Sequence, residues 1–148
     1  GARMNLIPYK GSGPALIDLV AGHMFAHVDQ ISSALPFIKE QRIRAIAVTT
    51  AKRAAALPQV PTLAESGVPG FDASTVTGIL APAATPREVI ARLNNTLNKV
   101  LATPAVRDRF TALGAEVQPS TSEELGKFVR EDLALWVKVV KQAGIKVQ

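Results

Sequence analysis

The chain has 148 residues, of which 47% are hydrophobic and 20% are charged, and its formal net charge is +5. These values are ordinary for a globular domain with a sizeable core, and no stretch approaches the roughly 20 apolar residues of a membrane-spanning helix. The lack of cysteine excludes disulfides, thiolate catalysis and Cys-ligated zinc, and one Trp and one Tyr among scattered basic residues argue against nucleic-acid binding.

In the first half of the chain, short apolar runs alternate with segments of helical spacing. In chain order these predict a strand at 5–8, a turn at 10–14, a helix at about 13–21, a strand at 24–28, a helix at 31–38 and a strand at 44–49. This alternation is typical of an α/β fold with mostly parallel strands joined by crossover helices. A loop at 51–60 follows, and a capping box from Thr62 to Glu65 predicts a short helix.

The second half is predicted to contain more helix than strand. Its elements are a strand at 75–81, a helix from Thr85 to about 101, a short helix from 103 that ends at Gly114, an edge strand at 115–117 and a long helix starting at Thr121. Capping boxes, Thr85 with Glu88 and Thr121 with Glu124, predict the starts of two of these helices. Three amphipathic helices with one strand to cover indicate that part of the fold is absent.

The turn at 10–14 and the acidic residue that follows strand 24–28 form the candidate ligand site. Backbone N–H groups near Ser12, Gly13 and Ala15 would point at one spot in front of a helix N-terminus, which favours an anion. Asp29 would stand at the carboxyl end of a strand, where ligands collect in open α/β sheets. The alternatives are an ordinary glycine-rich turn and an Asp29 that only caps the next helix.

Other chemistry has little support in the sequence. The two histidines, His23 and His27, lack the further ligands of a metal site and are predicted to be surface or satisfied core residues. Gly11-Ser12-Gly13 lacks the third glycine of a dinucleotide fingerprint, which falls on Leu16, and no P-loop or nucleophile elbow is present. We therefore expect no catalytic residues, no metal and no cofactor, and we expect a protein that is not an enzyme.

Several consecutive segments together resemble the Bug-type receptors, the extracytoplasmic solute-binding proteins of tripartite tricarboxylate transporters. The resemblance covers essentially the whole chain and rests on segments in the family's order: YKGSGPALIDLVAG, ALPFI, RIRAIAVTTAKR, LPQVPTLAESGVPGF, GILAP, TPREVIARLN, ALGAE and WVKVVKQAGIK.

This resemblance implies a periplasmic-binding-protein-like α/β fold of type II, with two lobes that close on a small carboxylate, no cofactor and no reaction. It also implies ligand-binding positions: backbone donors at Gly11, Ser12, Gly13 and Ala15, with Asp29 facing the same cleft. The intact receptor would work in the periplasm with membrane transporter subunits. No signal-peptide pattern opens this sequence.

The sequence departs from the family pattern in two places and in its extent. Phe25 stands where members usually carry Asp, and Val76 and Thr77 stand where aromatic residues are usual. The chain corresponds to the C-terminal half, with residues 5–72 as a partial second lobe and 73–148 as the segment returning to the first lobe. We therefore expect weak carboxylate binding and self-association, or, as the alternative, a self-associating remnant without ligand capture.

Overall fold

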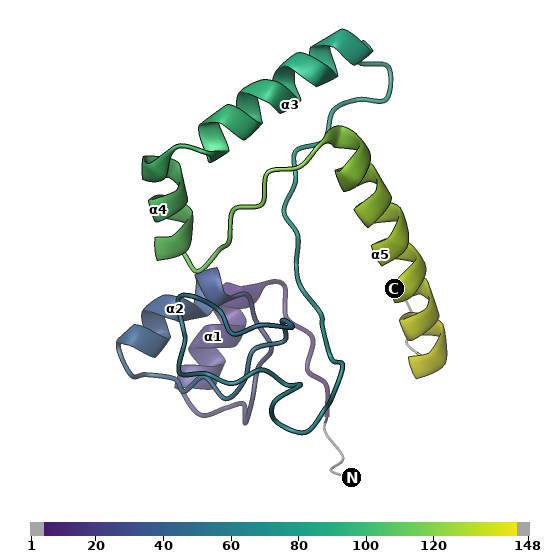
Figure 1. Ribbon diagram of the computed structural model, residues 1–148. Coiled ribbons are helices and arrows are strands. Elements are labelled where there is room, and N and C mark those ends of the chain that lie inside the picture. Colours follow the sequence, from purple (N-terminus) through teal and green to yellow (C-terminus); the bar gives the residue numbers. More distant parts are fainter. Residues whose placement is uncertain (1–4, 145–148) are drawn as a thin grey trace. The chain divides into compact units, whose positions relative to one another are not determined.

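The computed structural model describes residues 5–144, which form five α-helices in two compact units (Figure 1). The first unit extends to Val76 and takes in Asp108–Glu116, and the second contains Thr77–Arg107 and the residues from Val117 onward. The helices are α1 (Ser12–Val20), α2 (Ile31–Lys39), α3 (Arg87–Leu101), α4 (Pro104–Ala112) and α5 (Ser122–Ala143). None of these helices is both long and apolar enough to cross a lipid bilayer.

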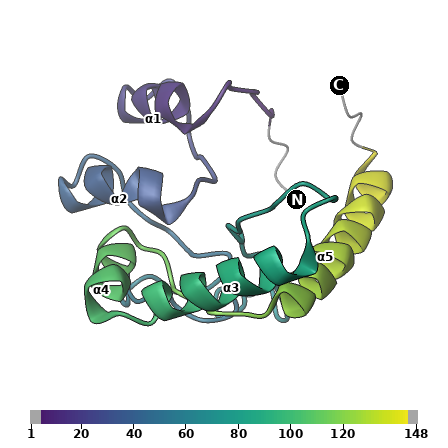
Figure 2. The same cartoon turned by 90° about the horizontal axis from the view of Figure 1, so that it is seen from above.

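The first unit has a buried hydrophobic core. Helices α1 and α2 pack against each other (Figure 2), and Leu35 of α2 is buried together with Val48, Leu57 and Val60 from the segments that follow it. Gly114, just after α4, lies so close to Ile31 that a Cβ there would overlap the Ile31 side chain. The first unit therefore brings together elements that are distant in the sequence, since Gly114 and Ile31 are 83 positions apart.

The predicted strands are extended segments without a sheet in the described residues. The β pairing between them is one parallel bridge, in which Val48 N–H donates to the carbonyl of Pro61 and Leu63 N–H donates to the carbonyl of Val48, both at 2.9 Å. The prediction of a mostly parallel sheet is therefore not confirmed. The physical reason is that a strand needs a neighbour on which to form its hydrogen-bond ladder, and the sequence pattern of a strand supplies none.

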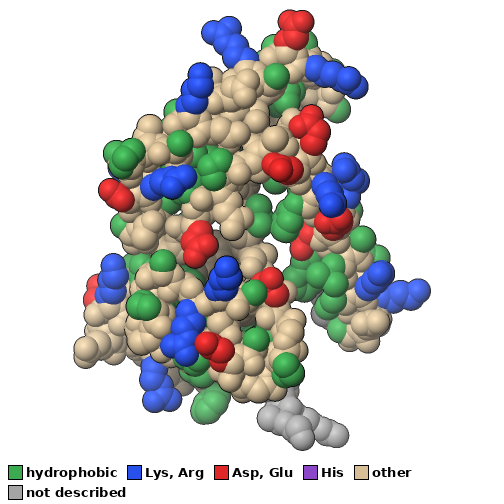
Figure 3. All heavy atoms as spheres, in the orientation of Figure 1, with side chains coloured by type: hydrophobic (Ala, Val, Ile, Leu, Met, Phe, Trp, Pro, Cys, Tyr) green, Lys and Arg blue, Asp and Glu red, His purple; other side chains and the backbone are tan. Residues whose placement is uncertain are grey.

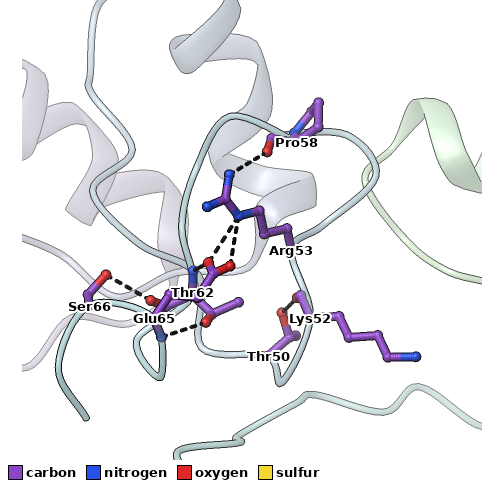
Figure 4. Close-up of polar contacts among 7 residues, drawn as sticks. All are labelled: Thr50, Lys52, Arg53, Pro58, Thr62, Glu65 and Ser66. Carbon is purple, nitrogen blue, oxygen red and sulfur yellow. Dashed lines mark hydrogen bonds and ion pairs between the residues drawn. The ribbon is translucent and has the colours of Figure 1, made fainter. Parts of the chain in front are cut away.

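A loop from Thr50 to Ser66 is closed by polar contacts (Figure 4). Arg53 Nε donates to both carboxylate oxygens of Glu65 at 2.9 and 3.2 Å, and its guanidinium also donates to the carbonyl of Pro58. The predicted capping box is present, since Thr62 N–H donates to Glu65 and Glu65 N–H donates to Thr62 Oγ1. The helix predicted after it is wrong, because these residues form turns.

In the second unit, α3 and α5 are in contact, and polar side chains of α3 reach the segment before α5. Asn94 and Asn98 both donate to the carbonyl of Ser120, at 2.9 and 3.0 Å. No described residue of this unit is buried. Figure 3 shows hydrophobic side chains on the surface of α5. In this helix Leu133 is 64% exposed and Trp136 is 44% exposed.

The helix-start predictions had mixed outcomes. At α5 the Thr121–Glu124 capping box is complete and confirmed. At α3 the predicted Thr85–Glu88 box is wrong, because Pro86 occupies the N-cap position and no side chain caps the helix. A proline at the N-cap has no N–H to donate to the side chain three residues later, so the reciprocal pattern of a capping box cannot form there.

Candidate functional site

The turn before α1 has a backbone conformation that favours glycine. Gly11 is the N-cap residue of α1 with a φ of 132°, a value that residues with a Cβ rarely adopt. No side chain caps the helix, so the N–H groups of its first turn have no side-chain partner. Such a turn presents backbone donors together with the positive end of the helix dipole, which is the usual basis of an anion site.

The first residues of α1 differ in how open they are. Ser12 is half-buried and Gly13 exposed, whereas Ala15 is completely buried. In a helix that begins at Ser12, the carbonyl of the N-cap residue Gly11 is the regular acceptor for the Ala15 N–H. Ser12 and Gly13 are therefore the more accessible donors. Pro14 occupies the third helical position, where the N–H has no intrahelical acceptor and its absence costs no hydrogen bond.

Buried and polar contacts hold α1 in place. Ala15 and Leu16 are buried, and the Tyr9 hydroxyl, before the turn, donates to Asp18 Oδ2 at 2.6 Å. His23, after the helix, lies with Nδ1 3.3 Å from Asp18 Oδ1. The hydrogen bond from Tyr9, followed by that from His23, lowers the pKa of Asp18, and the bond to Asp18 raises the pKa of Tyr9. Asp18 thus connects the segments that enter and leave α1.

The structure brings the predicted turn and the predicted carboxylate into direct contact. Ser12 Oγ donates to Asp29 Oδ1 at 2.6 Å, although the two residues are 17 positions apart. Asp29 Oδ1 also accepts the N–H of Gln30 at 2.8 Å. The N-cap of α2 is Gln30 and has no side-chain cap, so the alternative in which Asp29 serves as the N-cap of α2 is wrong.

The other Asp29 oxygen faces a histidine. His27 Nε2 lies 3.9 Å from Asp29 Oδ2, and the side chains of His27 and Asp29 are 23% and 9% exposed. Both atoms are buried, and neither has a hydrogen-bond partner among the described residues. Of the two histidines predicted to be surface or satisfied core residues, His23 is exposed, whereas the half-buried His27 is neither. The sequence held a signal for this pairing, because residues two apart in an extended segment lie on the same face.

Other candidate features lie away from α1. One small hollow is formed by residues 54–56 with Thr111 and 114–116, and a shallow one is formed by Ile38, residues 41–45 and 59–61. In the described part of the chain, no group of three or more His, Cys, Asp or Glu side chains could hold a metal ion. Among the described residues, the contact of Ser12 with Asp29 is the feature that joins the predicted site residues.

Comparison with solved structures places the fold among periplasmic solute-binding proteins. The periplasmic binding protein BugD superimposes with a TM-score of 0.85 at 36% identity, over 98% of this chain and 50% of that one. The R. palustris protein Rpa4515, solved with adipate, gives a TM-score of 0.86 at 36% identity, over 93% of this chain and 46% of that one.

The sequence comparison identifies the family. Residues 1–145 match the family described as the tripartite tricarboxylate transporter family receptor, TctC, and the chain belongs to this family. Protein BugT of Bordetella pertussis is 36% identical over all 148 residues, which make up 45% of BugT. The chain thus spans about half the length of such relatives. This confirms the predicted resemblance to Bug-type solute-binding receptors.

Proposed function

We propose that the chain is the C-terminal part of a periplasmic receptor that binds a small carboxylate and delivers it to a tripartite tricarboxylate transporter. The ligand carboxylate is received in front of α1 by backbone donors of the predicted set Gly11, Ser12, Gly13 and Ala15, chiefly by the accessible N–H groups of Ser12 and Gly13, with Asp29 beside it. The observation that carries the proposal is the uncapped start of α1 next to the Ser12–Asp29 contact, in a chain of the receptor family. Adipate, bound in the neighbour Rpa4515, supports a dicarboxylate ligand.

The donors at α1 recognise a charge rather than a carbon skeleton. Backbone N–H groups at a helix start bind an anion in a fixed place without contacts to the rest of the ligand. In the proposed site, Ser12 Oγ is already committed as a donor to Asp29, so the Ser12 contribution to the ligand is its backbone N–H. The remaining specificity comes from the part of the receptor that lies opposite this turn.

Residues 5–72 are proposed to be a partial second lobe, and 73–148 the segment that returns to the first lobe. In the intact receptor, the extended segments at 24–28 and 44–49 would pair with neighbouring strands in a mostly parallel sheet. Since each strand must satisfy its backbone groups, the missing half of the receptor would supply these partners. A site closed from one side has fewer donors and more water, so we expect this chain alone to bind weakly.

Calorimetric titration with adipate tests the proposal. We expect weak binding by this chain, tight binding by the same chain joined to its missing half, and loss of binding in Asp29→Ala. The matched control is Asp108→Ala, since Asp108 is exposed and lies outside the proposed site. Circular dichroism checks that both variants remain folded. Undiminished adipate affinity in Asp29→Ala would contradict the assigned site.

A second candidate, self-association without ligand capture, is favoured by the lack of buried residues in the second unit as far as residue 144. Its exposed apolar side chains on α5 include Leu133 and Trp136. Sedimentation of the chain and of Leu133→Gln distinguishes the candidates. A dimer or larger species that Leu133→Gln weakens, with no thermal shift by adipate, would favour self-association; a monomer whose stability rises with adipate would favour the receptor.

A further inference from the structure

We propose that His27 is a positioning residue for Asp29 and that, by taking up a proton, it lets the start of α1 accept an anion. The inference rests on the proposed carboxylate site and adds a residue and a pH dependence to it. Its structural basis is the pair of buried atoms without partners, His27 Nε2 and Asp29 Oδ2, which lie 3.9 Å apart.

The first step concerns the free-energy cost of leaving these two buried atoms without hydrogen bonds. A buried polar atom without a hydrogen bond is unfavourable, and a buried carboxylate without a counter-charge is more so. The distance of 3.9 Å exceeds that of a hydrogen bond, so a closure of about 1 Å would form an Nε2–H···Oδ2 bond. A protonated imidazole satisfies both atoms at once, because it brings a donor and a positive charge to the carboxylate.

The second step concerns the charge at the site. Asp29 contacts Ser12, the first residue of α1, so its carboxylate lies where a ligand carboxylate would arrive. Two carboxylates that share a site repel each other, and a positive charge beside one of them removes that cost. A protonated His27 makes the His27–Asp29 pair neutral overall while Asp29 continues to hold the Ser12 hydroxyl, so Asp29 supports the site through the Ser12 contact and Asp29→Ala loses that support.

The third step is to account for the other charges on the neighbouring elements. On α1 the titratable residue is Asp18, which is bound to Tyr9 and His23. On α2 it is Lys39, in the last turn. Lys10, in the turn itself, is exposed. No ion pair joins any of these to His27 among the described residues, which leaves Asp29 as its charged partner.

The proposed consequence is that carboxylate binding and proton uptake favour each other. Histidine is the side chain that ordinarily changes its charge between pH 5 and pH 8. Because coupling between two binding events is reciprocal, a proton on His27 strengthens ligand binding, and a bound ligand favours the proton. Where one proton is fully coupled, affinity changes by about tenfold per pH unit.

The first experiment needs no ligand. The chain has two histidines, so NMR resolves both imidazole titrations, and His23→Gln assigns them. We expect Asp29→Asn to shift the midpoint of the His27 titration to lower pH and to leave that of His23 unchanged. We expect Asp18→Asn to shift the midpoint of His23 to lower pH and to leave that of His27 unchanged. A His27 midpoint that does not respond to Asp29→Asn would overturn the inference, whether or not the protein binds a carboxylate.

The second experiment measures adipate binding at pH 6 and pH 8, in two buffers of different ionisation enthalpy. In the wild-type chain we expect adipate to bind more tightly at pH 6 than at pH 8, with less proton uptake on binding at pH 6. In His27→Gln we expect the same affinity at both pH values and no proton uptake. His23→Gln is the matched control and should behave as wild type. Equal pH dependence in wild type and His27→Gln would overturn the coupling. Absence of adipate binding at both pH values, with the NMR shift present, would contradict the carboxylate site and the coupling while leaving the His27–Asp29 pair established.

Discussion

The two units of the chain differ in how they are held together. The first unit buries side chains from helices and loops that are distant in the sequence, with Leu35, Val48, Leu57 and Val60 at its centre. The second unit has no buried residue in its described part, although its helices are longer. Helix length and packing are therefore separate properties here. The first unit is stabilised by the burial of apolar side chains, whereas the helices of the second unit rest on interactions between residues close in sequence.

The location of the proposed site follows from this difference. The turn before α1 is held by the buried Ala15 and Leu16 and by the Tyr9–Asp18 hydrogen bond, all within the first unit. A site of backbone donors needs such support, because donors on a mobile segment must be ordered by the ligand itself. The second unit offers apolar helix faces instead, which suit contact with another part of a receptor.

The largest expected effect is on the core of the first unit. Leu35→Ala removes a buried side chain from the cluster and should lower the free energy of unfolding by about 2–5 kcal/mol. The matched change in the second unit is Leu133→Ala, at a residue that is 64% exposed. This change should alter the free energy of unfolding by less than about 0.5 kcal/mol. Urea unfolding followed by NMR measures both, and equal losses would contradict the contrast between the units.

A smaller effect is expected at the start of α5. Thr121→Ala removes the capping box and should destabilise the helix by about 1 kcal/mol. Because the second unit lacks buried packing, we expect the loss to appear locally, as faster amide exchange in the first turns of α5. Thr85→Ala is the control, since no side chain caps α3. Similar changes in exchange at both helices would show that the cap is not the cause.

The smallest effect is expected from the surface contacts of the loop at 50–66. The hydrogen bond from Thr62 N–H, followed by that from Arg53, lowers the pKa of Glu65. A carboxyl with a lowered pKa in the folded state stabilises the fold above its unfolded pKa, and this stability is lost as the pH falls through the folded value.

Thermal unfolding of the wild type and Glu65→Gln between pH 7 and pH 3 measures this effect. The difference between the two should be greatest at pH 7 and should shrink at acid pH. Glu88→Gln, at an exposed residue in the first turn of α3, is the control. A wild-type advantage that is constant across this range would contradict a contribution from the ionised Glu65 carboxylate.

Much of the helical structure could be predicted because its signals are local. The Thr121–Glu124 pair starts α5 as predicted, and Gly22, with a φ of 79°, follows the end of α1. Local signals were misleading where a neighbour in the chain changes the geometry. Pro86 displaces the predicted cap of α3, and the residues after Thr62 keep their capping hydrogen bonds but form turns.

The sequence by itself determined the receptor family, which is carried by the order of motifs along the whole chain. It also determined most helix positions and the glycine turn before α1, because these depend on residues close together in the chain. Only the tertiary structure decided that Ser12 and Asp29 touch and that His27 Nε2 and Asp29 Oδ2 both lack a hydrogen-bond partner among residues 5–144. It also decided that the apolar runs remain without a sheet. The reason is that pairing between distant segments depends on which neighbours fold against them, and the pattern within one segment does not specify its partner.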